Sequence, residues 1–550
     1  MRAIHRFPND RNGNFAIVTS LLAVPMVLAI GIGIDYSSLG TTGNSLQQTL
    51  DTASLAIARE GTTLTDDQAQ AIAAEFLKSN FPDLDATPVV NRSGGSVSVS
   101  AVITPKLMFG GMFGTTSWQI QRTSIAEYAP AKYEVSLVLD TTGSMAGAKL
   151  AAMKEAVNTL VEAMGAQVDK PDNLKFAVVP YSTFVNVGPQ FGPTYNSKGM
   201  QVKAPAKWLD SLGKSPIPQT DLDTNVSRFS LYKHLGKTWP GCVETRLDDG
   251  KVAYDVTDAA PDAKKPASLF VPMFGIDEPD TAGAYPNSYL PDGIAGATAP
   301  ETGDPLADLR ARMKRYGAPD DFTPPTTFIQ WLIYILTTKW TPVVVNDTPA
   351  TFYSDDTEDK GPGYRCSSQP LMALTSDADA VKAKVNSLVA AGATNTFEGV
   401  MWGWRVLTSG EPFAEGAPKT DKSVRKVMIV LTDGVNWFGN LGNPANTLGS
   451  AYTSFGYLAD GRLNELKVGS TSGQTTAAMN AKTLQGCTNA KADGIEIYTI
   501  RLEVNDANTS ELLEKCATDA DHYFNAPSRD QLTPIFDQIR DRMTVVRLAS

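Results

Sequence analysis

Hydrophobic positions separate the chain into one long apolar run and many shorter periodic segments. Residues 15–34 are 20 consecutive residues without a charged side chain, which matches the hydrocarbon thickness of a bilayer. A cleaved signal peptide is the alternative, but its apolar core would be only about 7–15 residues long. No convincing small-x-small cleavage site follows Ile34. We therefore expect an uncleaved transmembrane anchor over residues 15–34.

The charges that flank this run predict its orientation. Three arginines, Arg2, Arg6 and Arg11, precede it, and no Lys or Arg follows until Arg59. The positive-inside rule then leaves residues 1–14 in the cytoplasm and places the rest of the chain on the other side of the membrane.

Residues 35–130 carry the pattern of a helical and α+β module. Residues 66–80 are predicted to be a helix that begins with a capping box at Thr65-Asp-Asp-Gln. Residues 96–103 and 118–128 alternate as two strands across a glycine-rich turn. The module is equally compatible with a stalk that holds the next domain away from the membrane and with a pilin-like packing role.

Strands and helices alternate over residues 131–550. Buried strands are predicted at 133–139, 175–181, 427–432 and 494–502, and amphipathic helices at 150–164, 378–390, 396–407, 475–492 and 531–546. This alternation predicts an α/β fold with a doubly wound, mostly parallel sheet. Between Pro189 and Pro370 lie 21 of the 34 prolines, so residues from about 189 to 370 are predicted to be an insertion, as are the Gly/Asn-rich residues 436–472.

Composition and motifs exclude several function classes. The net charge of −11 and the lack of a Lys/Arg-rich block argue against nucleic acid as a partner. Leu212-Gly-Lys-Ser215 does not make a phosphate loop because Trp208 stands where that loop needs glycine, and Ser144 does not lie in a Gly-x-Ser-x-Gly motif. We identify no catalytic residue and expect a protein that is not an enzyme.

The strand at 133–139 ends in a candidate metal-binding loop. Asp140 follows the strand directly, and Thr142 and Ser144 add two hydroxyls at alternate positions of a glycine-containing turn. Ligands of open α/β sheets bind at the carboxyl ends of the strands. A carboxylate with neutral oxygens is the ligand set that hard cations prefer. An aspartate at a strand end can also simply cap the following helix.

These residues resemble the metal-ion-dependent adhesion site of von Willebrand factor A (vWA) domains, which combines Asp-x-Ser-x-Ser with a distant Thr and a distant Asp. Thr394, in Gly392-Ala-Thr-Asn-Thr, and Asp433, after the strand at 427–432, are in family order, whereas Thr142 replaces the usual Ser. The resemblance implies that Asp140, Thr142, Ser144, Thr394 and Asp433 hold a divalent cation, with Mg2+ favoured over Mn2+ or Ca2+. It also implies a protein partner that supplies a carboxylate to the metal.

Three other segments resemble TadG-like proteins of the tight-adherence (Flp) pilus system, with their TadE/TadG-type N-terminal region. They are Gly13-Asn-Phe-Ala through Ile34-Asp-Tyr, Trp239-Pro-Gly-Cys-Val-Glu-Thr-Arg, and Trp402-Gly-Trp-Arg-Val-Leu. The resemblance implies a single-pass protein of the bacterial inner membrane, with most of its chain in the periplasm, that binds pilus or envelope components. A minor pilus component or scaffold with a merely structural metal, and a pilus-independent envelope adhesin, are the alternatives.

Four cysteines allow three disulfide pairings, and sequence alone does not choose among them. We expect Cys242 to pair with Cys366 and Cys487 with Cys516, because each pair belongs to one structural region and the exported side is oxidising. Buried free thiols are the alternative.

Overall fold

The protein is described by a computed structural model. It covers residues 14–544 except 61–63, 94–95, 128–131, 167–169, 198, 218, 220–221, 223–225, 279–286, 291–314, 318–328, 330–359, 422 and 441–447. Two compact units make up the chain. The first extends to Ala131, and the second runs from Lys132 to Met543.

The first unit is built on one long helix, α1 (Asn14–Glu60), which continues through Pro25. Helix α2 (Asp66–Asn80) begins with the predicted capping box, since Gln68 N donates to Thr65 Oγ1 at 3.3 Å and Thr65 N donates to Gln68 Oε1 at 2.8 Å. Three antiparallel strands pair in the order β1 (Thr87–Ser93), β2 (Ser96–Ile103) and β3 (Ile120–Glu127). The expected α+β module is therefore confirmed, with β1 as an additional strand.

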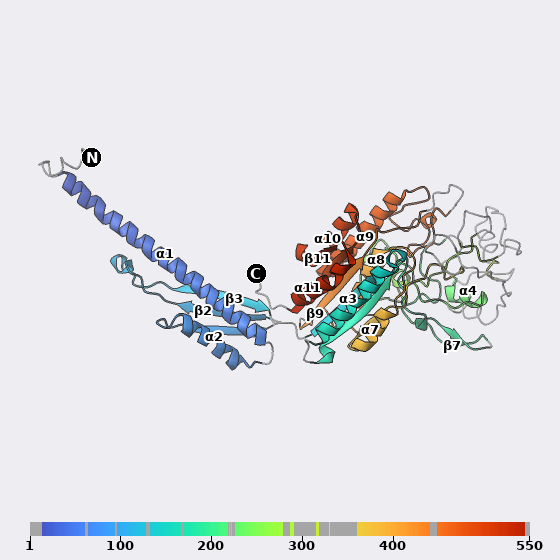
Figure 1. Cartoon of the computed structure of the whole chain (residues 1–550), viewed down its shortest axis with the longest axis horizontal. Helices are drawn as coiled ribbons and strands as arrows, with labels where there is room; N and C mark the ends of the chain where they lie inside the picture. Colours follow the sequence, from blue (N-terminus) through green and yellow to red (C-terminus); the bar gives the residue numbers. More distant parts are fainter. Residues whose placement is uncertain are drawn as a thin grey trace. The chain divides into compact units, whose positions relative to one another are not determined.

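A small core holds this unit together. It joins the second half of α1 to α2 and to one face of the sheet, through Leu46, Leu50, Ile57, Ala73, Leu77, Val97 and Val99. The N-terminal part of α1 extends beyond the sheet (Figure 1). Within the described residues one helix, Val18–Glu60, is long and apolar enough to cross a membrane.

A six-stranded sheet forms the centre of the second unit. Its order is β11 (Tyr523–Ala526), β10 (Glu496–Leu502), β9 (Val424–Thr432), β4 (Lys132–Asp140), β5 (Leu174–Tyr181) and β8 (Met372–Thr375). All neighbours are parallel except β8, which runs antiparallel to β5 at one edge. The mostly parallel sheet is confirmed, and β8 is a strand that the sequence pattern does not predict.

Helices cover both faces of this sheet, as a doubly wound fold requires. Side chains of α3 (Ala148–Gly165), α7 (Ala378–Asn386) and α11 (Leu532–Thr544) share one core with Val135, Leu137 and Leu139 of β4. Those of α8 (Thr396–Arg405), α9 (Ser472–Ala492) and α10 (Ala507–Cys516) share the opposite core, which contains Val138. The two cores follow the alternation of side chains along β4.

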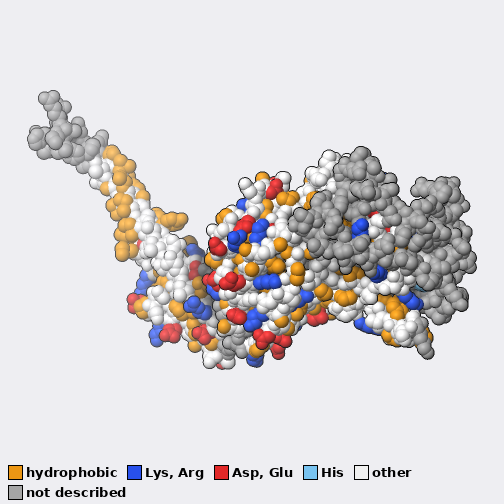
Figure 2. Space-filling view, turned by 45° about the vertical axis from the view of Figure 1, so that its right-hand side comes forward, with side chains coloured by type: hydrophobic (Ala, Val, Ile, Leu, Met, Phe, Trp, Pro, Cys, Tyr) orange, Lys and Arg blue, Asp and Glu red, His pale blue; other side chains and the backbone are white. Residues whose placement is uncertain are grey.

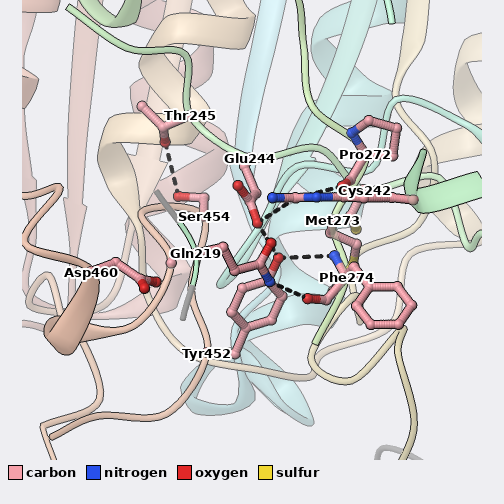
Figure 3. Close-up of polar contacts among 12 residues, drawn as sticks. Gln219, Cys242, Glu244, Thr245, Pro272, Met273, Phe274, Tyr452, Ser454 and Asp460 are labelled. Atoms are coloured by element: carbon pink, nitrogen blue, oxygen red, sulfur yellow. Dashed lines mark hydrogen bonds and ion pairs between the residues drawn. The ribbon is translucent and has the colours of Figure 1, made fainter. Parts of the chain in front are cut away.

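The two predicted insertions fold together. The first, between β5 and β8, includes β6 (Thr194–Tyr195), β7 (Gln201–Lys203) and α4 (Arg228–His234). Its buried Glu244 binds Arg228 at 2.7 Å and, across to the second insertion, Arg462 at 2.7 Å and the Tyr452 hydroxyl. Figure 3 shows this junction, where Tyr452 also accepts the Phe274 backbone N–H at 2.9 Å. The insertions therefore share one buried polar network.

Both expected cysteine pairs are disulfide-bonded in the structure. Cys242–Cys366 links two distant points of the first insertion, with 124 residues of separation. Cys487–Cys516 ties α9 to α10, with a separation of 29 residues. The four cysteines therefore leave no free thiol.

Candidate metal site

Three loops meet at the carboxyl ends of β4 and β9, where the candidate metal ligands were expected. Backbone hydrogen bonds tie the loops together: Gly143 N donates to Gly392 O at 3.0 Å, and Ala391 N donates to Thr141 O at 2.8 Å. Trp437 N, on the loop after β9, donates to the carbonyl oxygen of Thr394 at 3.0 Å. The sheet thus brings three segments that are far apart in sequence to one place.

Four of the five predicted residues form a continuous run of side-chain oxygens. Thr142 Oγ1 donates to Asp140 Oδ1 at 2.6 Å and lies 3.0 Å from Ser144 Oγ. Ser144 Oγ in turn donates to Asp433 Oδ1 at 2.6 Å. Asp140, Thr142 and Asp433 are buried, whereas Ser144 is exposed. The run therefore reaches the surface at Ser144, between two buried carboxylates.

Thr394 is the fifth predicted residue and lies on the loop before α8. It is buried, and its hydroxyl lies so close to Gly434 that a Cβ at that glycine would sit 2.7 Å from Thr394 Oγ1. Gly434 directly follows Asp433. The structure therefore brings Thr394 beside the residue that follows Asp433, so that the two loops meet as the family order of the motifs predicts.

The inner oxygen of Asp140 is held by residues that the motif does not include. Thr432 Oγ1 donates to Asp140 Oδ2 at 2.7 Å, and the Tyr181 hydroxyl lies 3.5 Å from the same oxygen. Burial, with a further contribution from the Asp433 carboxylate, raises the pKa of Asp140 above its ordinary value. Burial likewise raises the pKa of Tyr181. Asp140 is therefore fixed in position at a site where a second negative charge is unfavourable.

Lys149 is a further member of the site that the sequence pattern does not predict. Its ammonium lies 2.7 Å from Asp433 Oδ2 and 4.0 Å from Glu503. A lysine in the first turn of α3 interacts unfavourably with the helix dipole. The position of Lys149 in the sequence could therefore have indicated that an acidic side chain lies nearby to offset this cost. Thr432 had no such signal, because its place beside Asp140 depends on the pairing of β9 with β4 in the folded sheet.

The donor set fits a hard divalent cation. It consists of two carboxylates and three hydroxyls, and none of the five predicted side chains contains nitrogen or sulfur. Across the described part of the chain, no group of three or more His, Cys, Asp or Glu side chains could hold a metal ion. A cation at this site would therefore depend on the hydroxyls as well as on Asp140 and Asp433.

A comparison with protein families matches residues 364–538 to the von Willebrand factor type A domain. The match begins near the end of the first insertion, yet β4 and β5, which precede the insertion, lie in the same sheet as β9 and β10, which fall within the match. The first insertion therefore separates β4, α3 and β5 from the matched part of the domain. No curated protein matches the chain.

Solved structures similar to this chain include three pilus proteins. The pilus adhesin SpaC from Lactobacillus rhamnosus GG has a TM-score of 0.31 and 10% identity, covering 84% of this chain and 34% of its own. The vWF domain of the tip protein Mfa5 from Porphyromonas gingivalis has a TM-score of 0.30 and 10% identity. The match covers 75% of this chain and 95% of the Mfa5 domain. A point mutant of the PilB minor pilin from Streptococcus sanguinis has a TM-score of 0.32 and 10% identity. The match covers 84% of this chain and 79% of the PilB chain. This chain thus spans about a third of SpaC.

Proposed function

We propose that this chain, which carries a von Willebrand factor type A domain, captures a protein partner through a divalent cation. The ligands are Asp140, Thr142, Ser144, Thr394 and Asp433, and Mg2+ is the cation that the oxygen donors favour, ahead of Mn2+ or Ca2+. The observation that supports this most is the run of hydrogen-bonded oxygens from buried Asp140 to exposed Ser144.

Each residue has a role that follows from its position. Asp140 is fixed by the Thr142 backbone N–H at 2.9 Å and by Thr432, so its carboxylate needs no reorganisation to meet a cation. Ser144 is the exposed member of the run, and its hydroxyl joins the Asp140 loop to the buried Asp433 carboxylate. The bound cation would supply the positive charge that a carboxylate of the partner recognises.

The proposed context is the envelope of a bacterium. Residues 15–34 anchor the chain in the inner membrane, the N-terminus is cytoplasmic, and the vWA domain is periplasmic. The apolar first part of α1 and the charge asymmetry around it support this topology. The segments that resemble TadG-like proteins support a proposed role in the assembly or anchoring of a tight-adherence pilus, and we propose that this role is binding without catalysis.

A scaffold with a structural metal is the second candidate, because the site itself joins three loops. The Gly143–Gly392 and Ser144–Asp433 hydrogen bonds are the observations that favour it. In this case the cation would strengthen an existing connection between the loops. A third candidate, an envelope adhesin unrelated to pili, uses the same site with a different partner.

Calorimetric titration of Mg2+, Mn2+ and Ca2+ into the full-length protein tests the site. We expect saturable binding to the wild type, its loss in Asp140→Ala, and its retention in Asp530→Ala, which removes an exposed carboxylate elsewhere in the domain. Unchanged binding to Asp140→Ala would contradict the site.

Partner capture from the envelope fraction should then require Mg2+. Capture that persists in EDTA, together with a large metal-dependent rise in melting temperature, would favour the scaffold.

A further inference from the structure

The connection between β2 and β3 is a folded loop. Leu107 N donates to Thr116 O at 2.9 Å, and Trp118 N donates to Pro105 O at 3.2 Å. A short 3-10 turn, Gly110–Phe113, forms its tip. Gly110 allows the tight packing, since a Cβ there would lie 2.3 Å from Thr115 O. The shape of the loop is thus fixed by its own backbone.

This folded loop exposes large apolar side chains. Met108 is 80% exposed, Met112 63%, Phe113 46% and Trp118 58%. Residues 107–121 contain no charged side chain. Several exposed apolar residues on one structured element are typical of a surface that contacts another apolar phase.

The loop is fixed against α1 at one level of the helix. The Asp35 carboxylate accepts hydrogen bonds from Met108 N at 2.8 Å and Phe109 N at 3.0 Å. One turn earlier on α1, a Cβ at Gly31 would lie 2.9 Å from Phe109 Cγ. The loop therefore lies beside residues 31–35 of the helix.

That level is the end of the apolar segment of α1. Exposed hydrophobic residues of the helix include Val27, Ile30, Ile32 and Ile34, and Figure 2 shows hydrophobic side chains along this part of α1. At about 1.5 Å of rise per residue, the 20 residues 15–34 extend about 30 Å, and Gly31 lies about 5 Å inside the end at Ile34. The loop and the helix therefore present apolar surface at the same depth.

We propose that this loop, residues 107–118, inserts into the bilayer interface beside the end of the transmembrane segment. The inference rests on the membrane anchor of the proposed function. Insertion by about 5–10 Å is typical of interfacial apolar elements, and tryptophan prefers this depth. The loop gives the chain a second membrane contact.

Two features of the loop suit this location. The Asp35 carboxylate, at the membrane boundary, is satisfied by two backbone N–H groups, which reduces the cost of a charge at this depth. Lys106 precedes the uncharged stretch and is exposed, so its ammonium can reach the headgroups. Together the helix and the loop would fix the rotation and tilt of α1, as interfacial anchors do.

A fluorescent label at Met112 tests the insertion. Because all four native cysteines are disulfide-bonded, Met112→Cys gives the full-length protein a single free thiol. The labelled protein is placed in nanodiscs that contain lipids with a doxyl quencher near the headgroup end of the acyl chain. Ala71→Cys, on the exposed side of α2, is the matched control. We expect the Met112 label to be quenched several-fold more than the Ala71 label, and to be shielded from aqueous iodide.

The outcomes separate this inference from the anchor itself. Resistance of the full-length protein to alkaline extraction from membranes is measured first. Release by alkaline extraction would contradict the anchor and the inference with it. If the protein resists extraction but iodide quenches the Met112 label as strongly as the control, only the loop insertion is overturned. Shielding from both iodide and the doxyl lipids would mean that protein, such as a second copy, covers the loop, which also overturns the insertion.

Discussion

Asp433 shares its two oxygens between different kinds of partner. Oδ1 accepts the Ser144 hydroxyl at 2.6 Å, while Oδ2 binds the Lys149 ammonium at 2.7 Å. The Asp433 side chain has no exposed area, whereas that of Lys149 is 23% exposed. Lys149 can therefore move toward solvent more easily than Asp433 can. We infer that the Lys149 ammonium neutralises the Asp433 carboxylate when no cation is bound. When a cation binds, the same ammonium repels it and lowers its affinity.

Lys149→Met should strengthen Mg2+ binding by about tenfold or more, which corresponds to about 1.4 kcal/mol. The reason is that a cation bound at Asp433 would no longer be repelled by the nearby ammonium. Without metal the variant should be less stable than the wild type, because a buried carboxylate loses its counter-charge. Calorimetry and melting curves with and without Mg2+ measure both effects.

Lys154→Met is the control for Lys149→Met. It removes the same charge from the same helix, but Lys154 donates to the carbonyl oxygen of Asn386 at 2.9 Å. Its Mg2+ affinity should equal that of the wild type. Weaker Mg2+ binding in Lys149→Met would mean that the lysine holds Asp433 in its binding position.

At the scale of single elements, α8 packs unusually close to the sheet. A Cβ at Gly399 would lie 2.6 Å from Tyr181 Cδ1, and a Cβ at Gly403 would lie 2.3 Å from Val138 Cγ2 and 2.7 Å from Met428 Sδ. The two glycines are one turn apart on the same face of α8. They let the helix that follows Thr394 rest directly on β4 and β9.

Gly403→Ala should destabilise the domain by about 1–3 kcal/mol, because the added methyl group overpacks a buried contact. Gly473→Ala is the matched control, since a Cβ there would meet only Thr471 Oγ1, at 3.9 Å. That change in α9 should be neutral or stabilising by up to about 1 kcal/mol. Thermal unfolding of both variants measures the difference, and equal melting temperatures would contradict the close packing of α8.

His522 links two elements at the other end of the sheet. Its Nε2 lies 2.9 Å from Glu496 Oε1 on β10, and its Nδ1 lies 2.6 Å from Asp519 Oδ1. Burial opposes the charge on His522, but its bonds to Glu496 and Asp519 outweigh burial and raise the pKa of His522. Burial opposes the Glu496 charge as well, but hydrogen bonds from His522 and Arg425 lower the pKa of Glu496 to about 2.

These shifts predict a pH dependence of stability. The His522 contribution is complete below its unfolded pKa of about 6.5 and is lost as pH rises through the higher folded value. The Glu496 contribution is complete above about pH 4.3 and is lost as pH falls toward about 2. His522→Gln should therefore cost about 2 kcal/mol at pH 5.5 and less at pH 8.5, as measured by unfolding at both pH values.

His234→Gln provides a control of opposite sign for His522→Gln. Burial lowers the pKa of His234 to about 4, so the wild type loses stability as pH falls from 8.5 to 5.5 and the unfolded state takes up the proton. The difference in unfolding free energy between the wild type and His234→Gln should therefore be smaller at pH 5.5 than at pH 8.5. If both histidine variants changed in the same direction, the ion pair between His522 and Glu496 would not explain the effect.

Local signals account for what the sequence predicts about the elements. The start of α2 is predicted because a capping box involves residues only three apart. Asp140, Thr142 and Ser144 are likewise grouped by one turn after one strand. Strands β1 and β8 are not predicted. The sequence of β1, Thr-Pro-Val-Val-Asn-Arg-Ser, contains a proline and does not alternate apolar and polar residues, and β8 has only four residues. The strand that pairs with β8, β5, lies on the far side of the first insertion.

The candidate metal site is likewise predicted only in part from the sequence. The sequence predicts Thr394 and Asp433 through their order relative to Asp140, and the structure places them at the same edge of the sheet. The partner of Lys149 follows from sequence only if the loops around β4 and β9 are already placed in space. Contacts that close over the sheet therefore need the three-dimensional structure.

At the scale of the vWA domain, the first insertion supports the loop that carries Thr394, at the proposed metal site. Ser367 Oγ lies 3.0 Å from Ser182 Oγ, and a Cβ at Gly392 would lie 2.4 Å from that Ser367 oxygen. Thr183 Oγ1 accepts the Ala393 backbone N–H at 3.0 Å. The loop that carries Thr394 therefore rests on the two ends of the insertion. Cys366 fixes one of these ends through its disulfide with Cys242.

Removing the two disulfides separately tests this connection. Loop-closure entropy predicts a cost of about 5 kcal/mol for Cys242→Ser with Cys366→Ser and about 4 kcal/mol for Cys487→Ser with Cys516→Ser, so both double variants should melt at lower temperature. Only the first should also bind Mg2+ several-fold more weakly, because it frees the segment beneath Gly392, whereas the second frees α9 from α10. Titration below both melting points measures the affinities. Equal affinities would mean that the Thr394 loop keeps its position without the disulfide, and the insertion would then have no part in forming the proposed metal site.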